Sequence, residues 1–273
     1  MSPREGPAAG GGLALEPGAR HPTAVVDGDA ELDESVSLGP FAVVGPGVSL
    51  GKGVKVGPHA LVEKNTRVGA GCEIHNGAVL GTDPQDLKYE GEESWLEVGP
   101  RTVIREYATL NRGTAASGTT RVGADCLVMA YAHVAHDCRL GDHVILANSV
   151  AMGGHVEIGD WAVVGGLVAV HQFVRIGEHA FVGGGSRLPQ DVVPYTTVAG
   201  NPCAAYGINS EGLRRRSFED ETIRDLKRAY RAIFRSDRAI GDALDALEQK
   251  GGLRQEVRAM VRFVRASERG ITT

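Results

Sequence analysis

An aliphatic residue recurs at every sixth position along most of this chain. Written in sixes from His21, the sequence gives blocks such as HPTAVV, DGDAEL and GPFAVV, each ending in an aliphatic side chain. The register pauses twice and resumes each time without a slip. Such a period is neither the stripe of an amphipathic α-helix nor the alternation of a simple β-strand. The repeat positions are Val26, Leu32, Leu38, Val44, Leu50, Val56, Val62, Val68, Ile74, Leu80, Val98, Ile104, Leu110, Val122, Val128, Val134, Leu140, Leu146, Met152, Ile158, Val164, Val170, Ile176, Val182 and Leu188.

The residues around each repeat aliphatic predict a strand and a corner. The position two before it is usually small, as at Ala42 and Ala60, and the position after it is often glycine, as at Gly45 and Gly57. This pattern is typical of a short strand with two inward side chains, followed by a corner where a missing Cβ helps. Three strands and three corners make one coil of 18 residues, and stacked coils pair their strands about 4.8 Å apart. Hexapeptide periodicity marks the parallel β-helix, and chains with this pattern wind left-handed, against the usual right-handed crossover.

The expected fold is therefore an all-β left-handed parallel β-helix with a small C-terminal α-helical domain. The two pauses predict loops at 81–97 and 111–121, and long loops on a rigid scaffold often carry function. We expect a flexible N-terminal extension over residues 1–20, the β-helix over 21–200 and the helical domain over 201–273.

The helical domain is expected because the repeat dissolves after Pro189. Ser217 is the expected N-cap of a helix with Glu219 in its first turn, and Gly241 and the pair Gly251-Gly252 are expected to break the helical run. The apolar positions of the first helix are Ile223, Leu226, Tyr230, Ile233 and Phe234, and those of the last are Val257, Met260, Val261 and Val264.

Composition and charge narrow the class of protein. With 38 glycines and only 5% aromatic residues, the core must rest on small and β-branched side chains. Residues 1–209 carry 14 basic and 23 acidic side chains, whereas residues 210–273 carry 15 and 11, and a basic tail suggests an anionic partner. No stretch approaches the roughly 18 apolar residues of a membrane span. We expect neither a membrane span nor a nucleic-acid partner.

The cysteines point to a reducing compartment. The four cysteines form no CxxC pair and have no metal-binding spacing. Cys72, Cys126 and Cys138 each fall at the inward position two before a repeat aliphatic, so we expect buried, reduced thiols. Residues 1–20 lack the apolar run of a signal peptide. The expected location is the cytoplasm.

A coil length of 18 residues places several histidines at one corner of the prism. Residues 18 apart stack, so His136, Gly154 and Gln172 share one column, and Asp137, His155 and Phe173 share the next. His171 lies in the neighbouring column. The expected cluster of His136, His155, His171 and Gln172 then spans roughly 10 Å along the axis. His133 lies one strand position away with its ring outward.

This corner predicts acyl-transfer chemistry. Histidine titrates near neutral pH and is a suitable general base, and the flanking glycines leave backbone N–H groups open to a developing oxyanion. The register of the repeat places the Cys138 side chain inward, and the sequence shows no Ser-His or Cys-His pair that could act as nucleophile and base. We therefore expect direct attack by a substrate hydroxyl rather than a covalent enzyme intermediate.

Five motifs resemble a known family. They read DLKY at 86–89, NRGT at 111–114, AHVAHDC at 132–138, AVHQF at 169–173 and NSEGLRRR at 209–216. Together they resemble the UDP-N-acetylglucosamine O-acyltransferases that begin lipid A synthesis, from about His21 to the C-terminus. The sister N-acyltransferase of that pathway shares the β-helix and a catalytic histidine but lacks the DLKY and EGLxRR elements in this arrangement.

The resemblance implies an activity and a catalytic group. The enzyme would transfer a (3R)-3-hydroxyacyl chain from acyl carrier protein to the 3-position of UDP-N-acetylglucosamine, without a cofactor. His136 would be the general base, Asp137 would orient it, and the Gly154 N–H would hold the thioester oxyanion. Members of the family are trimers with sites between neighbouring subunits, so two copies would contribute residues.

The resemblance also implies the binding residues. His133 and His155 would position the sugar and acyl groups, and Asp86 and Lys88 would reach the sugar from the first loop. The residues implied for the uridine and pyrophosphate end are His171, Gln172, Asn209, Glu211, Arg215 and Arg216.

Two residues of this chain lie at positions that vary among members of the family. Asn111 stands where many members have histidine, which puts any role assigned to that ring in doubt. Gly184 matches the position that limits acyl length, so a glycine there predicts a chain nearer C14 than C10. A plain corner glycine is the competing explanation.

The sequence leaves several functions open besides O-acyl transfer to the 3-hydroxy sugar. The acceptor could be a 3-amino analogue of the sugar. The chain could also be an acetyl-CoA-dependent hexapeptide acetyltransferase, a zinc enzyme of the carbonic-anhydrase type using His136 and His171, or a non-catalytic scaffold. We expect no metal, because Asp137 suits a base better and no third histidine follows at ligand spacing.

Overall fold

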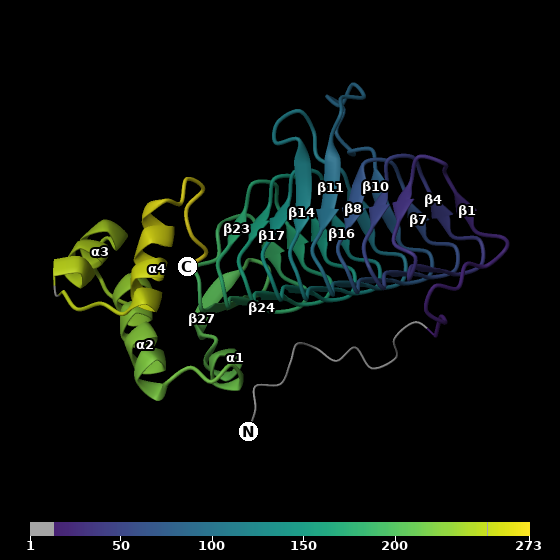
Figure 1. Ribbon diagram of the computed structural model, residues 1–273. Helices are drawn as coiled ribbons and strands as arrows, with labels where there is room; N and C mark the ends of the chain where they lie inside the picture. Colours follow the sequence, from purple (N-terminus) through teal and green to yellow (C-terminus); the bar gives the residue numbers. More distant parts are fainter. Residues whose placement is uncertain (1–13, 250) are drawn as a thin grey trace.

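The computed structural model describes residues 14–249 and 251–273. The chain winds as a left-handed parallel β-helix with three walls, capped by helices at its C-terminal end (Figure 1). The first wall contains β1 (Val25–Val26), β4 (Val43–Val44), β7 (Leu61–Val62), β10 (Val79–Thr82), β13 (Thr109–Asn111), β16 (His133–Val134), β19 (Ala151–Met152), β22 (Ala169–Val170) and β25 (Arg187–Leu188).

The other two walls repeat the same arrangement. The second wall contains β2 (Glu31–Leu32), β5 (Ser49–Leu50), β8 (Thr66–Val68), β11 (Trp95–Val98), β14 (Thr119–Val122), β17 (Arg139–Leu140), β20 (Glu157–Ile158) and β23 (Arg175–Ile176). The third wall contains β3 (Ser37–Leu38), β6 (Lys55–Val56), β9 (Glu73–Ile74), β12 (Val103–Ile104), β15 (Leu127–Val128), β18 (Ile145–Leu146), β21 (Val163–Val164), β24 (Phe181–Val182), β26 (Thr196–Ala199) and β27 (Ala204–Ile208). We call the edge between the first and second walls corner 1, between the second and third corner 2, and between the third and first corner 3.

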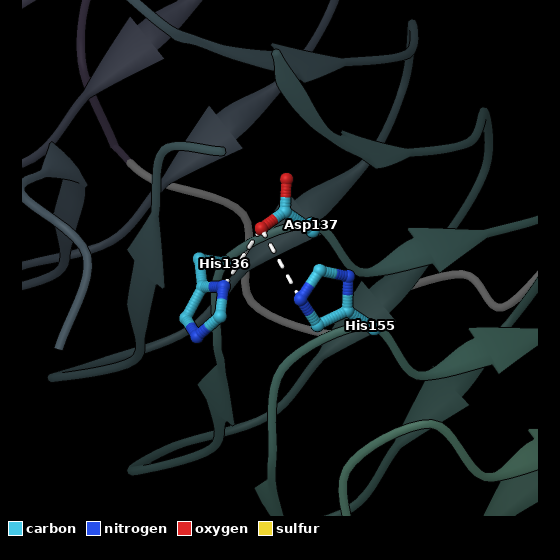
Figure 2. Close-up of side chains that lie close together, drawn as sticks. All are labelled: His136, Asp137 and His155. Atoms are coloured by element: carbon cyan, nitrogen blue, oxygen red, sulfur yellow. Dashed lines mark hydrogen bonds and ion pairs between the residues drawn. The ribbon is translucent and has the colours of Figure 1, made fainter. Parts of the chain in front are cut away.

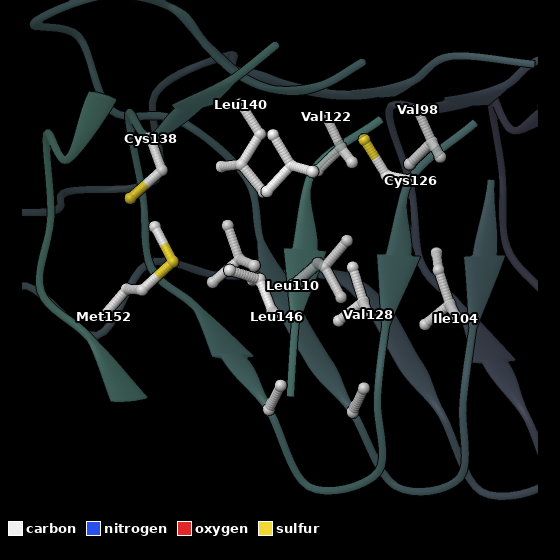
Figure 3. Close-up of a cluster of buried hydrophobic side chains, with 14 of the residues drawn as sticks. Val98, Ile104, Leu110, Val122, Cys126, Val128, Cys138, Leu140, Leu146 and Met152 are labelled. Atoms are coloured by element: carbon white, nitrogen blue, oxygen red, sulfur yellow. The ribbon is translucent and has the colours of Figure 1, made fainter. Parts of the chain in front are cut away.

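The strand register confirms the coil of 18 residues. His133 pairs with Ala151, which pairs in turn with Ala169. Every repeat aliphatic from Leu38 to Leu188 is buried, whereas Val26 in the first coil is 37% exposed because no complete coil lies beneath it. The aliphatics form interior ladders, and Cys126 and Cys138 lie among them as predicted (Figure 3). Stacked strands thus satisfy their backbone groups while side chains of modest size fill the prism.

Both predicted loops leave corner 1, but they are shorter than the repeat pattern indicates. β10 extends to Thr82 and β11 begins at Trp95, so the first loop spans 83–94. β13 extends to Asn111 and β14 begins at Thr119, so the second spans 112–118. The strands continue because β10 pairs with β13 and β11 with β14 beyond the repeat positions. Both loops project from the prism beside β11 and β14 (Figure 1).

The N-terminal extension lies mostly outside the described residues, which begin at 14. Its last part packs on the first coil: Arg20 forms a bridge with Leu38, and the Ser37 hydroxyl donates to the Glu16 carbonyl at 2.8 Å. None of the helices in the described chain combines the length and apolar character needed to cross a bilayer.

The C-terminal part contains α1 (Ser210–Arg215), α2 (Asp220–Phe234), α3 (Ile240–Gln249) and α4 (Gln255–Arg265). The Ser217 N-cap prediction was wrong: Glu219 occupies the N-cap of α2, and Ser217 adopts a positive φ of 59° in the turn before it. Gly241 does not break a helix but lies in the first turn of α3. The sequence pattern also missed α1, whose Asn209 side chain accepts the Gly212 N–H at 3.1 Å.

Candidate active site

His136 and Asp137 form a hydrogen-bonded pair at corner 1. Nδ1 of His136 lies 2.7 Å from Oδ2 of Asp137, while Nε2 of His136 makes no hydrogen bond within the described residues (Figure 2). The carboxylate can only accept, so Nδ1 carries the proton and Nε2 presents its lone pair. The His136 side chain is 13% exposed and that of Asp137 is fully buried. The pair is therefore arranged to take a proton at Nε2.

The Asp137 carboxylate is held by donors from the second loop. Thr114 donates its N–H to Oδ1 at 3.0 Å and its hydroxyl to Oδ2 at 2.8 Å, and the Ser117 hydroxyl donates to Oδ1. Burial raises the pKa of Asp137, but the hydrogen bonds from Ser117, His136 and Thr114 outweigh it, so this pKa lies below its ordinary value. The backbone N–H of Asp137 donates to the Thr120 hydroxyl at 2.8 Å.

The predicted columns of corner 1 are confirmed. His155 stacks on Phe173, one coil further on, with ring centroids 4.5 Å apart, and meets His136 edge-on at 5.2 Å. Asp137, His155 and Phe173 share a positive φ of about 60°, because each occupies the same place in successive corners. Nε2 of His155 lies 3.7 Å from Oδ2 of Asp137. One carboxylate thus faces two imidazoles.

Gly154 lies against the His136 ring. A Cβ on Gly154 would fall 2.5 Å from Cε1 and 2.6 Å from Nε2 of His136. Its N–H has no backbone partner among the described residues, while its carbonyl accepts the Phe173 N–H at 3.0 Å. A glycine is required here because any side chain would displace the ring.

His133 lies on β16 with its ring outward, as predicted. Its Nδ1 lies 2.7 Å from the Thr109 hydroxyl on β13. Burial lowers the pKa of His133, and the nearby His136 lowers it further. A neutral ring on the first wall is suited to hydrogen bonding rather than to ion pairing.

The first loop carries Asp86 and Lys88. Oδ1 of Asp86 accepts the Lys88 N–H at 3.0 Å, which folds the loop tip and leaves the Lys88 side chain exposed. Arg112, 1% exposed, ties the loops together by donating to the Gly81 carbonyl, to Asp83 and to the Tyr89 hydroxyl.

Asn111 also connects the strands that flank the loops. Its amide donates to the Thr82 hydroxyl and to the Asp83 carbonyl, both at 2.9 Å. In this chain the side chain therefore links β13 to the end of β10, and it is 3% exposed.

His171 and Gln172 occupy corner 1 above the pair but do not join its contacts. Nδ1 of His171 lies 3.0 Å from the Gln172 carbonyl and 3.1 Å from Nη2 of Arg269. Both residues are exposed. The structure thus brings together His136, Asp137 and His155, while His171 contacts the C-terminal segment instead.

The remaining predicted site residues lie at other corners of the same chain. Asn209 donates to the His179 carbonyl at 3.0 Å, and Arg216 donates to the Trp161 carbonyl at 3.2 Å, which places α1 against corner 2. Glu211 and Arg215 pair with each other at 3.1 Å on the exposed side of α1.

Gly184 is exposed at corner 3, one wall away from His136. Within one chain, therefore, the predicted site residues are spread over three corners.

The contacts of Thr114, Ser117 and Thr120 with Asp137 were not predicted from the sequence. Thr120 offered a signal, because it is a polar residue at the inward position two before a repeat aliphatic. Its hydroxyl fixes the backbone of Asp137 from one coil below. Ser117 carried no pattern of its own, since loop residues have no period.

One group of side chains could in principle hold a metal. One ligand atom each from His136, Asp137 and His155 lie within 4.8 Å of one another. Both oxygens of Asp137 already accept hydrogen bonds from hydroxyl or N–H donors. With the Nδ1 proton of His136, four donors occupy the roughly four lone-pair sites of this carboxylate, so the arrangement fits an imidazole–carboxylate pair better than a cation site.

The comparisons with known proteins agree on one family. Residues 191–272 match the family described as UDP N-acetylglucosamine O-acyltransferase, domain 2, and residues 47–82 and 119–154 match the bacterial transferase hexapeptide family. The acyl-[acyl-carrier-protein]–UDP-N-acetylglucosamine O-acyltransferase of Alkalilimnicola ehrlichii is 55% identical over 92% of this chain and 97% of its own length, and that of Halorhodospira halophila is 53% identical over 92% and 98%.

Solved structures show the same similarity in three dimensions. LpxA of Acinetobacter baumannii matches with a TM-score of 0.90 and 41% identity, covering 93% of this chain and 99% of its own. The UDP-N-acetylglucosamine O-acyltransferase of Moraxella catarrhalis gives 0.91 and 39% over the same shares. Relatives with more than half of their residues identical across nearly the whole length establish membership. The chain belongs to the acyl-[acyl-carrier-protein]–UDP-N-acetylglucosamine O-acyltransferase family of acyltransferases.

Proposed function

We propose that this enzyme transfers a (3R)-3-hydroxyacyl chain from acyl carrier protein to the 3-hydroxyl of UDP-N-acetylglucosamine, the first step of lipid A biosynthesis. The observation that carries the proposal is the His136–Asp137 pair, whose Nε2 has no hydrogen-bond partner in the described part of the chain and lies next to Gly154. The relatives are named for this donor and acceptor. The cytoplasm is the proposed location, because Cys72, Cys126 and Cys138 are buried free thiols of the kind found in reducing compartments.

The proposed reaction is a direct transfer. Nε2 of His136 takes the proton of the sugar 3-hydroxyl as its oxygen attacks the thioester carbonyl carbon. The oxyanion that develops is held by the Gly154 N–H. When the C–S bond breaks, the proton passes from His136 to the departing thiolate, and the carrier protein leaves as a free thiol. No redox change or external reactant is required.

Asp137 would keep His136 in the productive tautomer throughout. Its negative charge also stabilises the imidazolium that forms when the proton is taken. His155 and His133 would contact the acyl and sugar groups beside the pair. From the first loop, Asp86 and Lys88 would contact the sugar.

We further propose that the working enzyme is a trimer with each site between two copies. The surfaces of the three walls support this arrangement. The second wall is charged, and its outward residues include Arg67, Glu97, Arg121, Arg139, Glu157 and Arg175. From β12 to β24 the third wall presents Val103, Leu127, Ile145, Val163 and Phe181 outward, whereas its β6 and β9 carry the Lys55–Glu73 ion pair. The first wall presents Val43, Leu61, Val79, Ala151 and Ala169 outward, together with the polar Thr109, His133 and Arg187. Exposed apolar patches of this kind mark interaction surfaces, which supports packing against other copies of the chain.

The edge between the two apolar walls is apolar as well. Tyr107, Tyr131 and Leu167 of corner 3 are 51%, 63% and 73% exposed, and the two tyrosine rings stack at 5.4 Å. Packing the first wall of one copy near the third wall of the next would bring α1 of that neighbour toward corner 1. Asn209, Glu211, Arg215 and Arg216 could then bind the uridine and pyrophosphate together with His171 and Gln172.

Two experiments test the proposal. The first is mass spectrometry of the products formed from UDP-N-acetylglucosamine, its 3-amino analogue and a mixed pool of hydroxyacyl carrier proteins. O-acylated UDP-N-acetylglucosamine is the expected main product, and product from the amino sugar alone would contradict the assignment. Acetyl transfer from acetyl-CoA would also contradict it.

The second experiment tests the shared site by subunit mixing. His136→Ala and Arg215→Ala homotrimers should each be impaired, whereas coexpressed mixed trimers should regain activity because some sites take both native residues. The result is compared with a mixture of two His136→Ala preparations carrying different affinity tags. Mixed trimers no more active than the variants themselves would show that each site belongs to one chain.

A further inference from the structure

The Asp137 carboxylate depends on a loop that the proposed mechanism does not itself use. Three donors reach it from the second loop: the N–H and hydroxyl of Thr114 and the hydroxyl of Ser117. Thr114 is buried at 8% exposure and Asp137 at 3%. A carboxylate removed from water needs such donors to remain ionised. The orientation of the pair is therefore set partly by the second loop.

Each oxygen of the Asp137 carboxylate accepts two hydrogen bonds. Ser117 and the Thr114 N–H bind Oδ1, whereas His136 and the Thr114 hydroxyl bind Oδ2. Without the Ser117 hydroxyl, Oδ1 keeps one donor and the carboxylate can rotate about its Cβ–Cγ bond. Rotation would turn Oδ2 away from Nδ1 of His136. Ser117 thus acts on His136 only through Asp137.

The second loop is itself clamped to the first. Oε1 of Glu92 accepts the Ala115 N–H at 2.9 Å, and Oε2 accepts the Glu90 N–H at 3.0 Å. The Tyr89 hydroxyl donates to the Glu92 carbonyl at 3.2 Å and accepts from Arg112 at 3.0 Å. One acidic side chain therefore binds both loops, and the donors to Asp137 are held in place before substrate arrives.

We propose that Ser117 is a positioning residue for acyl transfer, holding Oδ1 of Asp137 so that Oδ2 faces Nδ1 of His136, on a loop that Glu92 clamps to the first loop. The inference rests on the proposed function, since it assumes that His136 is the base. Among the described residues the Ser117 hydroxyl donates to Asp137 and lies near the Thr119 carbonyl, so it would act on the reacting atoms only through Asp137. Its effect should appear in kcat and in the pH dependence rather than in sugar binding.

A purely structural role for Ser117 makes a different prediction. Its Oγ also lies 3.1 Å from the Thr119 carbonyl, so it could serve only to close the turn. A hydroxyl has one proton, and a buried carboxylate is the stronger acceptor for it. The titratable groups that face Asp137 are His136 and His155 at corner 1, with Glu92 across the second loop. Loss of the Ser117 donor would therefore weaken the contact between Asp137 and His136.

The test compares Ser117→Ala, Ser117→Thr and the wild type, using the full-length enzyme with hydroxyacyl carrier protein. For Ser117→Ala we expect kcat to fall roughly tenfold, with KM for the UDP-sugar within about twofold. The acid limb of kcat/KM should move to lower pH by about one unit, because a carboxylate turned away from Nδ1 no longer stabilises the protonated His136 ring. Ser117→Thr keeps the hydroxyl and should restore both values.

The matched control is Ser35→Ala, which removes a hydroxyl that donates to Asp33 at 2.5 Å in the first coil. It should leave kcat and the acid limb unchanged. A loss of kcat in Ser117→Ala with the acid limb in place would assign Ser117 to the turn alone and overturn the inference. So would an unchanged kcat. Absence of O-acyl transfer by the wild type would instead contradict the proposed function, so the two failures are distinguishable.

Discussion

The Cα of Gly154 lies so close to the His136 ring that a Cβ there would fall 2.6 Å from Nε2, the atom proposed to take the proton. The two residues are 18 apart in sequence and are brought together by one turn of the β-helix. The same glycine offers a backbone N–H without a partner among the described residues. The contact thus joins the proposed base to the proposed oxyanion donor.

Gly154→Ala should therefore remove activity without unfolding the protein. The new methyl group would push the His136 ring aside, and a displacement of about 1 Å costs on the order of a hundredfold in rate. Steady-state turnover and thermal melting would be measured together. Gly28→Ala is the control, because a Cβ at Gly28 meets nothing within 4 Å. Normal turnover by Gly154→Ala would show that the ring position is not critical.

Gly184 should permit a long acyl chain. It is exposed at corner 3, at the far edge of the first wall from His136, and the small exposed residues Ala151 and Ala169 lie on the wall between them. We expect C14 hydroxyacyl carrier protein to be turned over faster than C12 or C10. Gly184→Met should shift the preference toward shorter chains. A wild-type preference for C10 would leave Gly184 as a plain corner glycine.

His179 should make the folded protein sensitive to acid. Burial, and then the nearby Arg216, lower the pKa of His179 from 6.5 to about 4. Because the folded-state pKa lies below the unfolded value, the stability is fully present above pH 6.5 and is lost as pH falls from 6.5 toward 4.

Melting temperatures measured between pH 7.5 and 4.5 test this point. The wild type should melt at lower temperature as the pH falls, and His179→Phe should reduce that dependence because the ring stacks on Tyr195 without titrating. His59→Phe, at an exposed ring stacked on Phe41, is the control. Parallel profiles for the wild type and His179→Phe would show that His179 does not titrate on unfolding.

Metal removal should leave the reaction unchanged. The carboxylate oxygens of Asp137 are occupied by protein donors, so His136 and His155 lack a free anionic ligand between them. Dialysis against EDTA should not alter turnover, and elemental analysis should find well below one zinc ion per chain. Activity lost with EDTA and restored by zinc would favour a zinc enzyme instead.

The walls of this fold could be predicted from the sequence because each coil repeats the same pattern of inward and outward side chains. Inward positions recur every six residues, so one register error would expose the whole series. The stacking of His155 on Phe173 follows from the same arithmetic. Periodicity therefore fixes geometry wherever the period is unbroken.

The parts without a period could not be predicted in the same way. The Ser117 contact with Asp137 depends on the path of a loop, and α1 forms because Asn209 caps it beside corner 2. His171 contacts Arg269, which lies nearly a hundred residues later in the chain. No local sequence pattern predicts such a contact. Tertiary contacts decide these positions.

The most direct test of the central claim is turnover by His136→Ala, measured by mass spectrometry of the acylated sugar alongside melting temperature and sedimentation. Loss of a general base should lower kcat by about a thousandfold, while the fold and oligomeric state remain those of the wild type because the ring lies at an outer corner. Turnover close to that of the wild type, particularly in a variant that has lost stability, would contradict the assignment of His136 as the base.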